Sequence, residues 1–313
     1  MATIADNIAE LMRIRLEMKE FAKIPDDVPF EQYGAWLAWA GEKAPAQPLM
    51  ADFVNKRYSM DGVPCRFEDI FEFERLSKAW DFCNKLTFTE YQENVPRIDT
   101  RGILLEPQGT NLAYDSINPE NWMSKSNADI TPLVSSTGLQ GINYVSHATR
   151  VPSRAVSLPN TDSVRYTLGG WRNTNAIATS LLIRDTTTHT NLKGCSYFPN
   201  KNNSTDEWGT ISDIVYGSYT CEITPMNAIT AYFGSTSSIA GVLEGFNWFF
   251  IQVEPGDQRT SLIVTDNTSV TRLPETLTLK NPNQSIIVDA DEGIIQDKGT
   301  FSGFGHIRKI EVK

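Results

Sequence analysis

The sequence has few of the residues on which enzymes and metal sites depend. Only three histidines and four cysteines occur among 313 residues, and none stands in a CxxC, HxH or HExxH motif. No GxSxG elbow marks a serine nucleophile. We therefore expect no catalytic residues, no cofactor and no bound metal. The cysteines are expected to be buried free thiols: Cys65, Cys83, Cys195 and Cys221.

An excess of positive charge and long apolar runs are missing as well. The 28 Lys and Arg residues face 38 Asp and Glu residues, and the net charge of −10 argues against a nucleic-acid partner. No run of about 18 apolar residues is present, so we expect no insertion into a membrane. The first residues lack the basic and apolar regions of a signal peptide, which predicts folding in a cytoplasm.

Residues 1–43 are predicted to form a helical segment. Apolar residues recur every three or four positions over residues 3–23, and a second helical pattern covers residues 30–40. A single helix of this length is marginal in water. The segment is therefore either an intramolecular hairpin or an anchor that joins copies of the chain. In the second case the predicted oligomerisation contacts are Ile4, Ile8, Leu11, Met18 and Phe21.

The remainder of the chain has the pattern of an antiparallel β-protein. Residues 44–50 contain two prolines and are predicted to be a linker, and residues 51–313 are predicted to form one β-domain. Short β-like runs alternate there with turn residues, which favours a sandwich or barrel. Examples of these runs are residues 102–105, 163–168, 178–183, 218–223, 247–253, 260–264, 277–279, 285–288 and 307–312.

Three ordered blocks carry a family resemblance. Residues 96–112 read PRIDTRGILLEPQGTNL, and the pattern continues through Tyr114, Ser116 and Trp122. A second block lies upstream and includes residues 67–75, and a third covers residues 268–279, followed by a closing strand at 305–312. Together they resemble bacteriophage tail-fibre and virion-appendage proteins. The chain departs from that pattern at Gly109, where Arg is common, and at Glu275, where Asp is common.

The resemblance implies a homotrimeric structural component of a phage virion, built around a lectin-like jelly roll. It implies a tail fibre or similar appendage that contacts host-surface glycan, is assembled in the host cytoplasm and attaches to other virion proteins through the N-terminus. One alternative is a head fibre or collar decoration without receptor binding. Another is a glycan-degrading tailspike enzyme, for which Asp206 and Glu207 beside Trp208 are the candidate acids.

A sugar site needs an aromatic face for the apolar side of a ring and polar groups for its hydroxyls. The candidate glycan-binding residues near predicted loops are Trp171, Arg172, Tyr197, Trp208 and Tyr216. The alternative for each aromatic is a partly buried residue of the β-domain. The acidic run Asp289, Asp291 and Glu292, with Asp297 nearby, could bind calcium, but it lacks the DxDxDG pattern, and an exposed turn is the simpler explanation.

Overall fold

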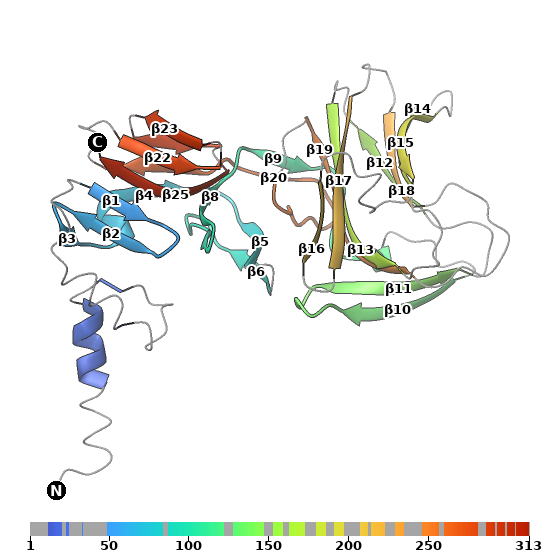
Figure 1. Ribbon diagram of the computed structural model, residues 1–313. Helices are drawn as coiled ribbons and strands as arrows, with labels where there is room; N and C mark the ends of the chain where they lie inside the picture. The colour runs from blue at the N-terminus through green and yellow to red at the C-terminus, as the bar shows by residue number, and fades with distance from the viewer. Residues whose placement is uncertain are drawn as a thin grey trace, which may run out of the picture. The chain divides into compact units, whose positions relative to one another are not determined.

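Figure 1 shows the computed structural model of the chain. It describes residues 12–20, 23–24, 33, 49–83, 87–121, 128–146, 153–158, 163–172, 180–185, 191–196, 207–211, 214–222, 229–234, 246–256, 260–280, 286–291, 293–297, 299–303 and 305–312. None of the helices within these residues combines the length and the apolar character that crossing a bilayer requires.

The N-terminal helical segment is described over residues 12–20, which form a helix. Two apolar side chains on it, Met12 and Leu16, are 63% and 64% exposed. The guanidinium carbon of Arg15 lies 5.6 Å from the ring centroid of Tyr33, which is buried. This contact joins the two predicted helical regions within one chain. Met18 is half-buried in the helix, and four predicted oligomerisation residues lie outside the described residues: Ile4, Ile8, Leu11 and Phe21.

The chain folds into two compact units, each built from separate stretches of sequence. Unit 1 comprises residues 1–76, 93–107 and 274–313, and unit 2 comprises residues 77–92 and 108–273. The range 51–313, predicted to be one β-domain, is thus shared between the two units. The first strand begins at Leu49, inside the predicted linker. Hydrophobic periodicity predicts individual strands but not which strands share a core, so the division was not visible in the sequence.

Unit 1 contains two antiparallel sheets in its described residues. The larger has the order β23-β22-β25-β1-β2-β3, with β8 beside β25 and β7 beside β8, and the smaller has the order β24-β21-β4. One helical turn, α3 (Phe67–Ile70), leads directly into β4. The strands are β1 (Leu49–Asp52), β2 (Arg57–Met60), β3 (Val63–Pro64), β4 (Phe71–Glu74), β7 (Ile98–Asp99), β8 (Gly102–Leu105), β21 (Thr276–Leu279), β22 (Ile286–Ala290), β23 (Gly293–Asp297), β24 (Thr300–Ser302) and β25 (Gly305–Val312).

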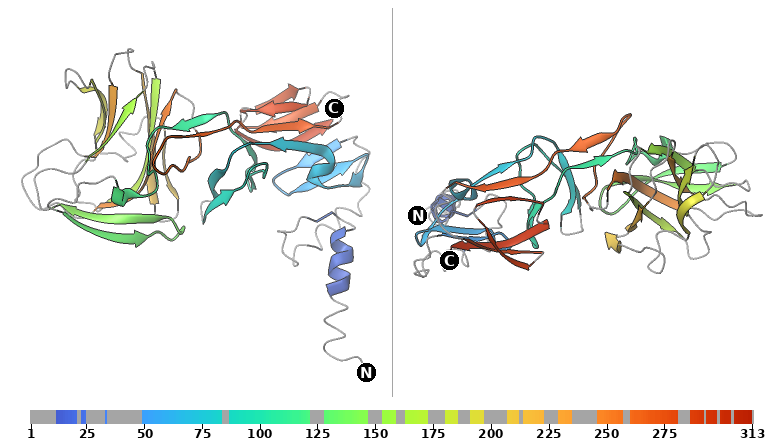
Figure 2. Two further views of the ribbon diagram at one scale, coloured as in Figure 1. Left: turned by 180° about the vertical axis from the view of Figure 1, so that it is seen from behind. Right: turned by 90° about the horizontal axis from the view of Figure 1, so that it is seen from above.

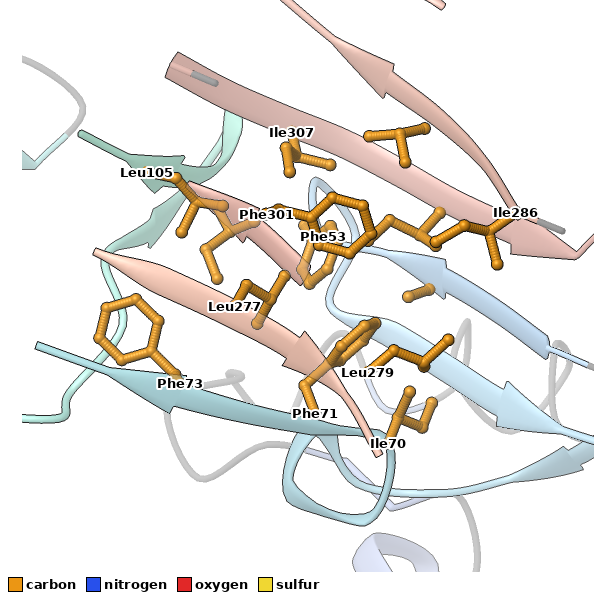
Figure 3. Close-up of a cluster of buried hydrophobic side chains, with 14 of the residues drawn as sticks. Phe53, Ile70, Phe71, Phe73, Leu105, Leu277, Leu279, Ile286, Phe301 and Ile307 are labelled. Carbon is orange, nitrogen blue, oxygen red and sulfur yellow. The ribbon is translucent and has the colours of Figure 1, made fainter. Parts of the chain in front are cut away.

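An apolar core holds the strands of unit 1 together (Figure 3). Every second residue of β4, β21 and β22 is buried, as expected for strands with one face on a core. The aromatic members include Phe53, Phe71 and Phe301. At Gly102 φ is +114°, and a Cβ atom would lie 2.1 Å from the carbonyl oxygen of Ile307. Only glycine can therefore occupy this position of the 96–112 block.

Four charged side chains are also buried in unit 1. Glu275 accepts hydrogen bonds from Nη1 of Arg75 at 2.7 Å and from Nη2 of Arg97 at 2.6 Å. Arg97 Nη2 also donates to Glu106 Oε2 at 2.7 Å, and the backbone N–H of Glu106 donates to Glu275 at 2.9 Å. Two cations and two anions balance each other in this network, as burial requires. All four residues come from the three sequence blocks, and Glu275 forms ion pairs despite its departure from the pattern.

Unit 2 contains a six-stranded antiparallel sheet in the order β10-β11-β19-β13-β17-β16 and a four-stranded sheet in the order β12-β18-β14-β15. The four-stranded sheet lies beside the six-stranded one in Figures 1 and 2. A hairpin (β5–β6) and a strand pair (β9 with β20) complete the described part of the unit. The elements are β5 (Ala79–Cys83), β6 (Thr87–Tyr91), β9 (Gly109–Asn111), η2 (Pro119–Asn121), β10 (Ala128–Val134), β11 (Gln140–Ser146), β12 (Ser153–Leu158), β13 (Ser163–Arg172), β14 (Ser180–Asp185), β15 (Asn191–Ser196), β16 (Glu207–Ile211), β17 (Ile214–Glu222), β18 (Ile229–Gly234), β19 (Phe246–Pro255) and β20 (Val270–Arg272).

The predicted fold class is confirmed. The chain is mainly β, with antiparallel sheets, and a short helix precedes them. Predicted runs such as 102–105, 247–253 and 307–312 fall in β8, β19 and β25. These runs were recognisable because apolar residues of high β-propensity are bounded there by turn residues.

The predicted run at 260–264 is wrong, because this segment is irregular. Side chains, and not a neighbouring strand, form hydrogen bonds with backbone N–H and C=O groups of this segment. Gln252 Oε1 accepts from the N–H of Ile263 at 2.6 Å, and Asn111 Nδ2 donates to the Ile263 carbonyl at 2.8 Å. Thr265, which comes directly after this segment, donates its backbone N–H to Ser116 Oγ at 2.8 Å. Buried side-chain partners of this kind replace a β-ladder and leave no trace in hydrophobic periodicity.

Candidate functional site

Two of the predicted glycan-binding residues lie at the end of strand β13. Trp171 is paired with Asn247 on β19, and Arg172 is paired with Phe246. Trp208 lies on the edge strand β16, opposite Gly217 of β17. Tyr197 lies outside the described residues, as does Asp206, one of the two acids considered for glycan hydrolysis. Positions 171 and 172 are therefore consecutive in β13 and belong to opposite faces of the sheet, and position 208 lies on another strand of the same sheet.

Tyr216 lies within strand β17 and is half-buried. It packs against an apolar cluster that includes Ile214 and Phe250. Gly169 of β13 is opposite both Tyr216 and Phe250 in the register. Because directly paired positions share a face of an antiparallel sheet, this arrangement favours the alternative of a partly buried aromatic for Tyr216.

A pair of asparagine side chains meets on the face that contains position 171. Asn247 is paired with Trp171 on one side and with Asn143 of β11 on the other. Asn143 Nδ2 donates to Asn247 Oδ1 at 2.8 Å, and both residues are half-buried. Adjacent positions, Ile142 and Trp248, are buried, as the alternation of a strand requires. Each amide has two N–H donors and one carbonyl acceptor, so the mutual bond uses only part of their capacity.

These two asparagines are not among the site residues predicted from the sequence. Each asparagine is next to a buried apolar residue in its strand. Its neighbours in the sequence therefore look like those of any polar residue on the outer face of a sheet. Their meeting depends on the register between β11 and β19, which are separated by about a hundred residues. No local motif encodes such a contact.

The acidic run at the end of β22 is engaged in ion pairs. Nε of Arg308 donates to Asp289 at 3.0 Å, and its Nη1 donates to Asp291 at 3.2 Å. The backbone N–H of His306 donates to Asp291 Oδ2 at 2.8 Å. Burial acts to raise the pKa of Asp291, but hydrogen bonds from His306 and the charges of His306 and Arg308 lower it overall. Among the residues that the structure describes, no cluster of three ligands could hold a metal ion.

The structure describes the side chain of one of the four cysteines, Cys65. Cys65 is a free, half-buried thiol that packs against the core of unit 1. Burial, with a contribution from the nearby Asp69 carboxylate, raises its pKa to about 12. The thiol therefore stays protonated and unreactive at neutral pH. The side chains of Cys83, Cys195 and Cys221 lie outside the described residues.

No protein-family model and no curated protein matches the sequence. Three solved structures are similar in fold. The first is a carbohydrate-binding module of lichenase 5A from Cellvibrio mixtus in complex with cellotriose, with a TM-score of 0.29, 13% identity and coverage of 47% of this chain and 99% of that one. The second contains the CBM22-1 and GH10 modules of endo-1,4-β-D-xylanase 10B from Clostridium thermocellum with xylohexaose, with a TM-score of 0.31, 12% identity and coverage of 49% and 30%.

The third is a family GH115 4-O-methyl-α-glucuronidase with specificity for decorated arabinogalactans, with a TM-score of 0.28, 11% identity and coverage of 53% and 20%. The three TM-scores lie between 0.28 and 0.31. The function of this chain has to be argued from its own residues.

Proposed function

We propose that this chain is a non-enzymatic structural component of a bacteriophage virion, an oligomeric tail fibre or similar appendage that binds host-surface carbohydrate. One observation carries the virion assignment. The blocks that resemble phage appendage proteins contribute hydrogen-bonded buried polar residues to both units: Arg75, Arg97, Glu106 and Glu275 in unit 1, and Asn111 and Ser116 in unit 2. The blocks therefore act as a scaffold signature, which supports membership of the same structural class.

The proposed location is the virion, with assembly in the host cytoplasm and attachment to other virion proteins through residues 1–43. Immunogold labelling of particles with an antibody against this chain tests it. Label on the tail tip supports the proposal, whereas label on the head or collar supports the decoration alternative. Hydrolysis of host glycan by the purified chain would instead identify a tailspike enzyme.

The proposed oligomer is a homotrimer joined through the N-terminal helix. Met12 and Leu16 lie one helical turn apart and are largely exposed in the single chain, so a second copy would remove apolar surface from water. We expect native mass spectrometry to show three copies for the full chain and a monomer for Met12→Glu/Leu16→Glu. A wild-type chain that stays monomeric at micromolar concentration contradicts the trimer.

Carbohydrate binding is proposed at the face containing position 171. The Asn143–Asn247 amide pair supplies hydrogen-bonding groups there, and an aromatic at 171 suits the apolar side of a sugar ring. Trp171→Ala is expected to weaken glycan binding by about 1–3 kcal/mol, as for a truncated aromatic anchor. Isothermal titration with a glycan identified on an array measures this loss. Tyr114→Ala, which removes an exposed aromatic side chain of unit 2, should leave binding unchanged.

Thermal unfolding of the same variants separates binding from folding. A core tryptophan truncated to alanine costs roughly 3–5 kcal/mol of stability. A loss of that size in Trp171→Ala, with wild-type affinity in the folded fraction, would show that Trp171 is structural and would remove it from the proposed site.

A further inference from the structure

A cavity of about 270 Å³ lies in unit 2, beside the β5–β6 hairpin. Its lining comes from β5 and β6, from the irregular segment that includes residues 262–266, and from β20. Pockets for drug-sized ligands span roughly 300–1,000 Å³, so this cavity suits a smaller molecule. The lining residues are Ser77, Lys78, Ala79, Trp80, Glu90, Leu262, Ile263, Val264, Asp266, Val270 and Arg272.

Trp80 is half-buried and is one of the residues that line this cavity. The ring stacks on Phe88 with 4.8 Å between the centroids and an interplanar angle of 15°. Phe88 does not line the cavity, whereas Trp80 does. The stacking on Phe88 therefore holds the indole ring of Trp80 in place at the wall of the cavity. A flat aromatic surface held in this way is suited to stacking against the C–H face of a sugar ring.

Lys78 and Glu90 form an ion pair beside that surface. Lys78 Nζ lies 2.6 Å from Glu90 Oε1, and Gln92 Nε2 donates to the same oxygen at 2.7 Å. Within the described part of the chain, no donor is bonded to Glu90 Oε2. The hydrogen bond from Lys78 lowers the pKa of Glu90, and Gln92 lowers it further, so the group is a carboxylate at neutral pH. The Lys78 side chain is 58% exposed and that of Glu90 is 27% exposed, which leaves both within reach of a ligand.

We infer that this cavity is a second carbohydrate site, which holds one neutral pyranose ring against Trp80 and binds its hydroxyls through Lys78 and Glu90. Two cations and two anions line the cavity: Lys78, Arg272, Glu90 and Asp266. The balance favours neither an anionic nor a cationic ligand. A sugar hydroxyl both donates and accepts, so adjacent hydroxyls can donate to Glu90 Oε2 and accept from Lys78 Nζ. The volume limits the site to a single ring, as at the end of a glycan chain.

This inference rests on the proposed function for its ligand class but not on the face around position 171. The test uses the full chain and matched sugars that differ only at C6, where a carboxylate replaces the neutral hydroxymethyl group: glucose with glucuronic acid, and galactose with galacturonic acid. Saturation-transfer NMR gives the affinities. We expect binding of at least one neutral sugar and affinity reduced about tenfold or more for its uronic acid, because removing the added carboxylate from water costs free energy that a cavity of balanced charge does not return.

Glu90→Gln and Lys78→Met are expected to weaken binding of that sugar about tenfold. Trp80→Ala should abolish it, and the two rim variants decide the question if Trp80→Ala does not fold. Glu120→Gln, at an exposed acid elsewhere in unit 2, is the matched control and should bind as wild type.

Unchanged affinity in Glu90→Gln and Lys78→Met, or a preference for the uronic acid, overturns the inference. If Trp171→Ala abolishes all sugar binding while Trp80→Ala leaves it intact, the proposed function stands and the second site does not exist. If the wild-type chain binds no saccharide, the proposed carbohydrate binding at the face containing position 171 and the proposed second site both fail.

Discussion

Glu275→Gln is expected to destabilise unit 1 by about 3–5 kcal/mol, the cost of breaking a buried ion pair by removing one partner. The Glu275 carboxylate is fully buried and binds Arg75, Arg97 and the backbone N–H of Glu106. Gln keeps the shape but removes the charge. Two buried guanidinium groups would then share the single carboxylate of Glu106. Urea unfolding followed by circular dichroism, at pH 7, measures the change in the free energy of unfolding.

Two companion variants separate charge from shape. Glu275→Asp keeps the charge, so its loss should be smaller than that of Glu275→Gln. Glu72→Gln, at an exposed position of β4, should change stability by less than about 0.5 kcal/mol. Equal stability of Glu275→Gln and wild type would mean that the network contributes nothing.

Asn111→Leu is expected to destabilise unit 2 by about 3 kcal/mol or more. The Asn111 side chain is fully buried and binds three separate segments. Oδ1 accepts from the N–H groups of Ala113 and Val253, each at 3.0 Å, and Nδ2 donates to the Ile263 carbonyl at 2.8 Å. Leucine has a similar volume but leaves these three backbone groups without their partner, at about 1–3 kcal/mol for each buried group.

Hydrogen exchange with mass spectrometry locates this effect. Faster exchange is expected in β19 and in residues 260–265, which Asn111 connects to β9, whereas the strands of unit 1 should keep their protection. Asn121→Leu, at an exposed position of the same unit, is the control. Uniformly faster exchange over both units would show that Asn111 does not act through the contacts described.

The sequence by itself determined the β-class of this protein and the position of many strands. Runs such as 102–105 and 307–312 were recognisable because turn residues bound short stretches that are rich in apolar residues of high β-propensity. Such patterns are local and do not depend on distant contacts. The ordered 96–112 block also predicted a structural module, and its buried Arg97 and Asn111 agree with that role. The strand runs and the 96–112 block are both continuous stretches of sequence, which is why they could be recognised without the structure.

Only the tertiary structure decided which residues share a core and which polar groups meet. The division into two units, the irregular backbone at 260–264 and the Asn143–Asn247 contact depend on partners far apart in sequence. The cavity beside Trp80 likewise joins two stretches separated by more than 160 residues. Because register and side-chain hydrogen bonds between distant segments fix these features, no local periodicity or propensity could predict them.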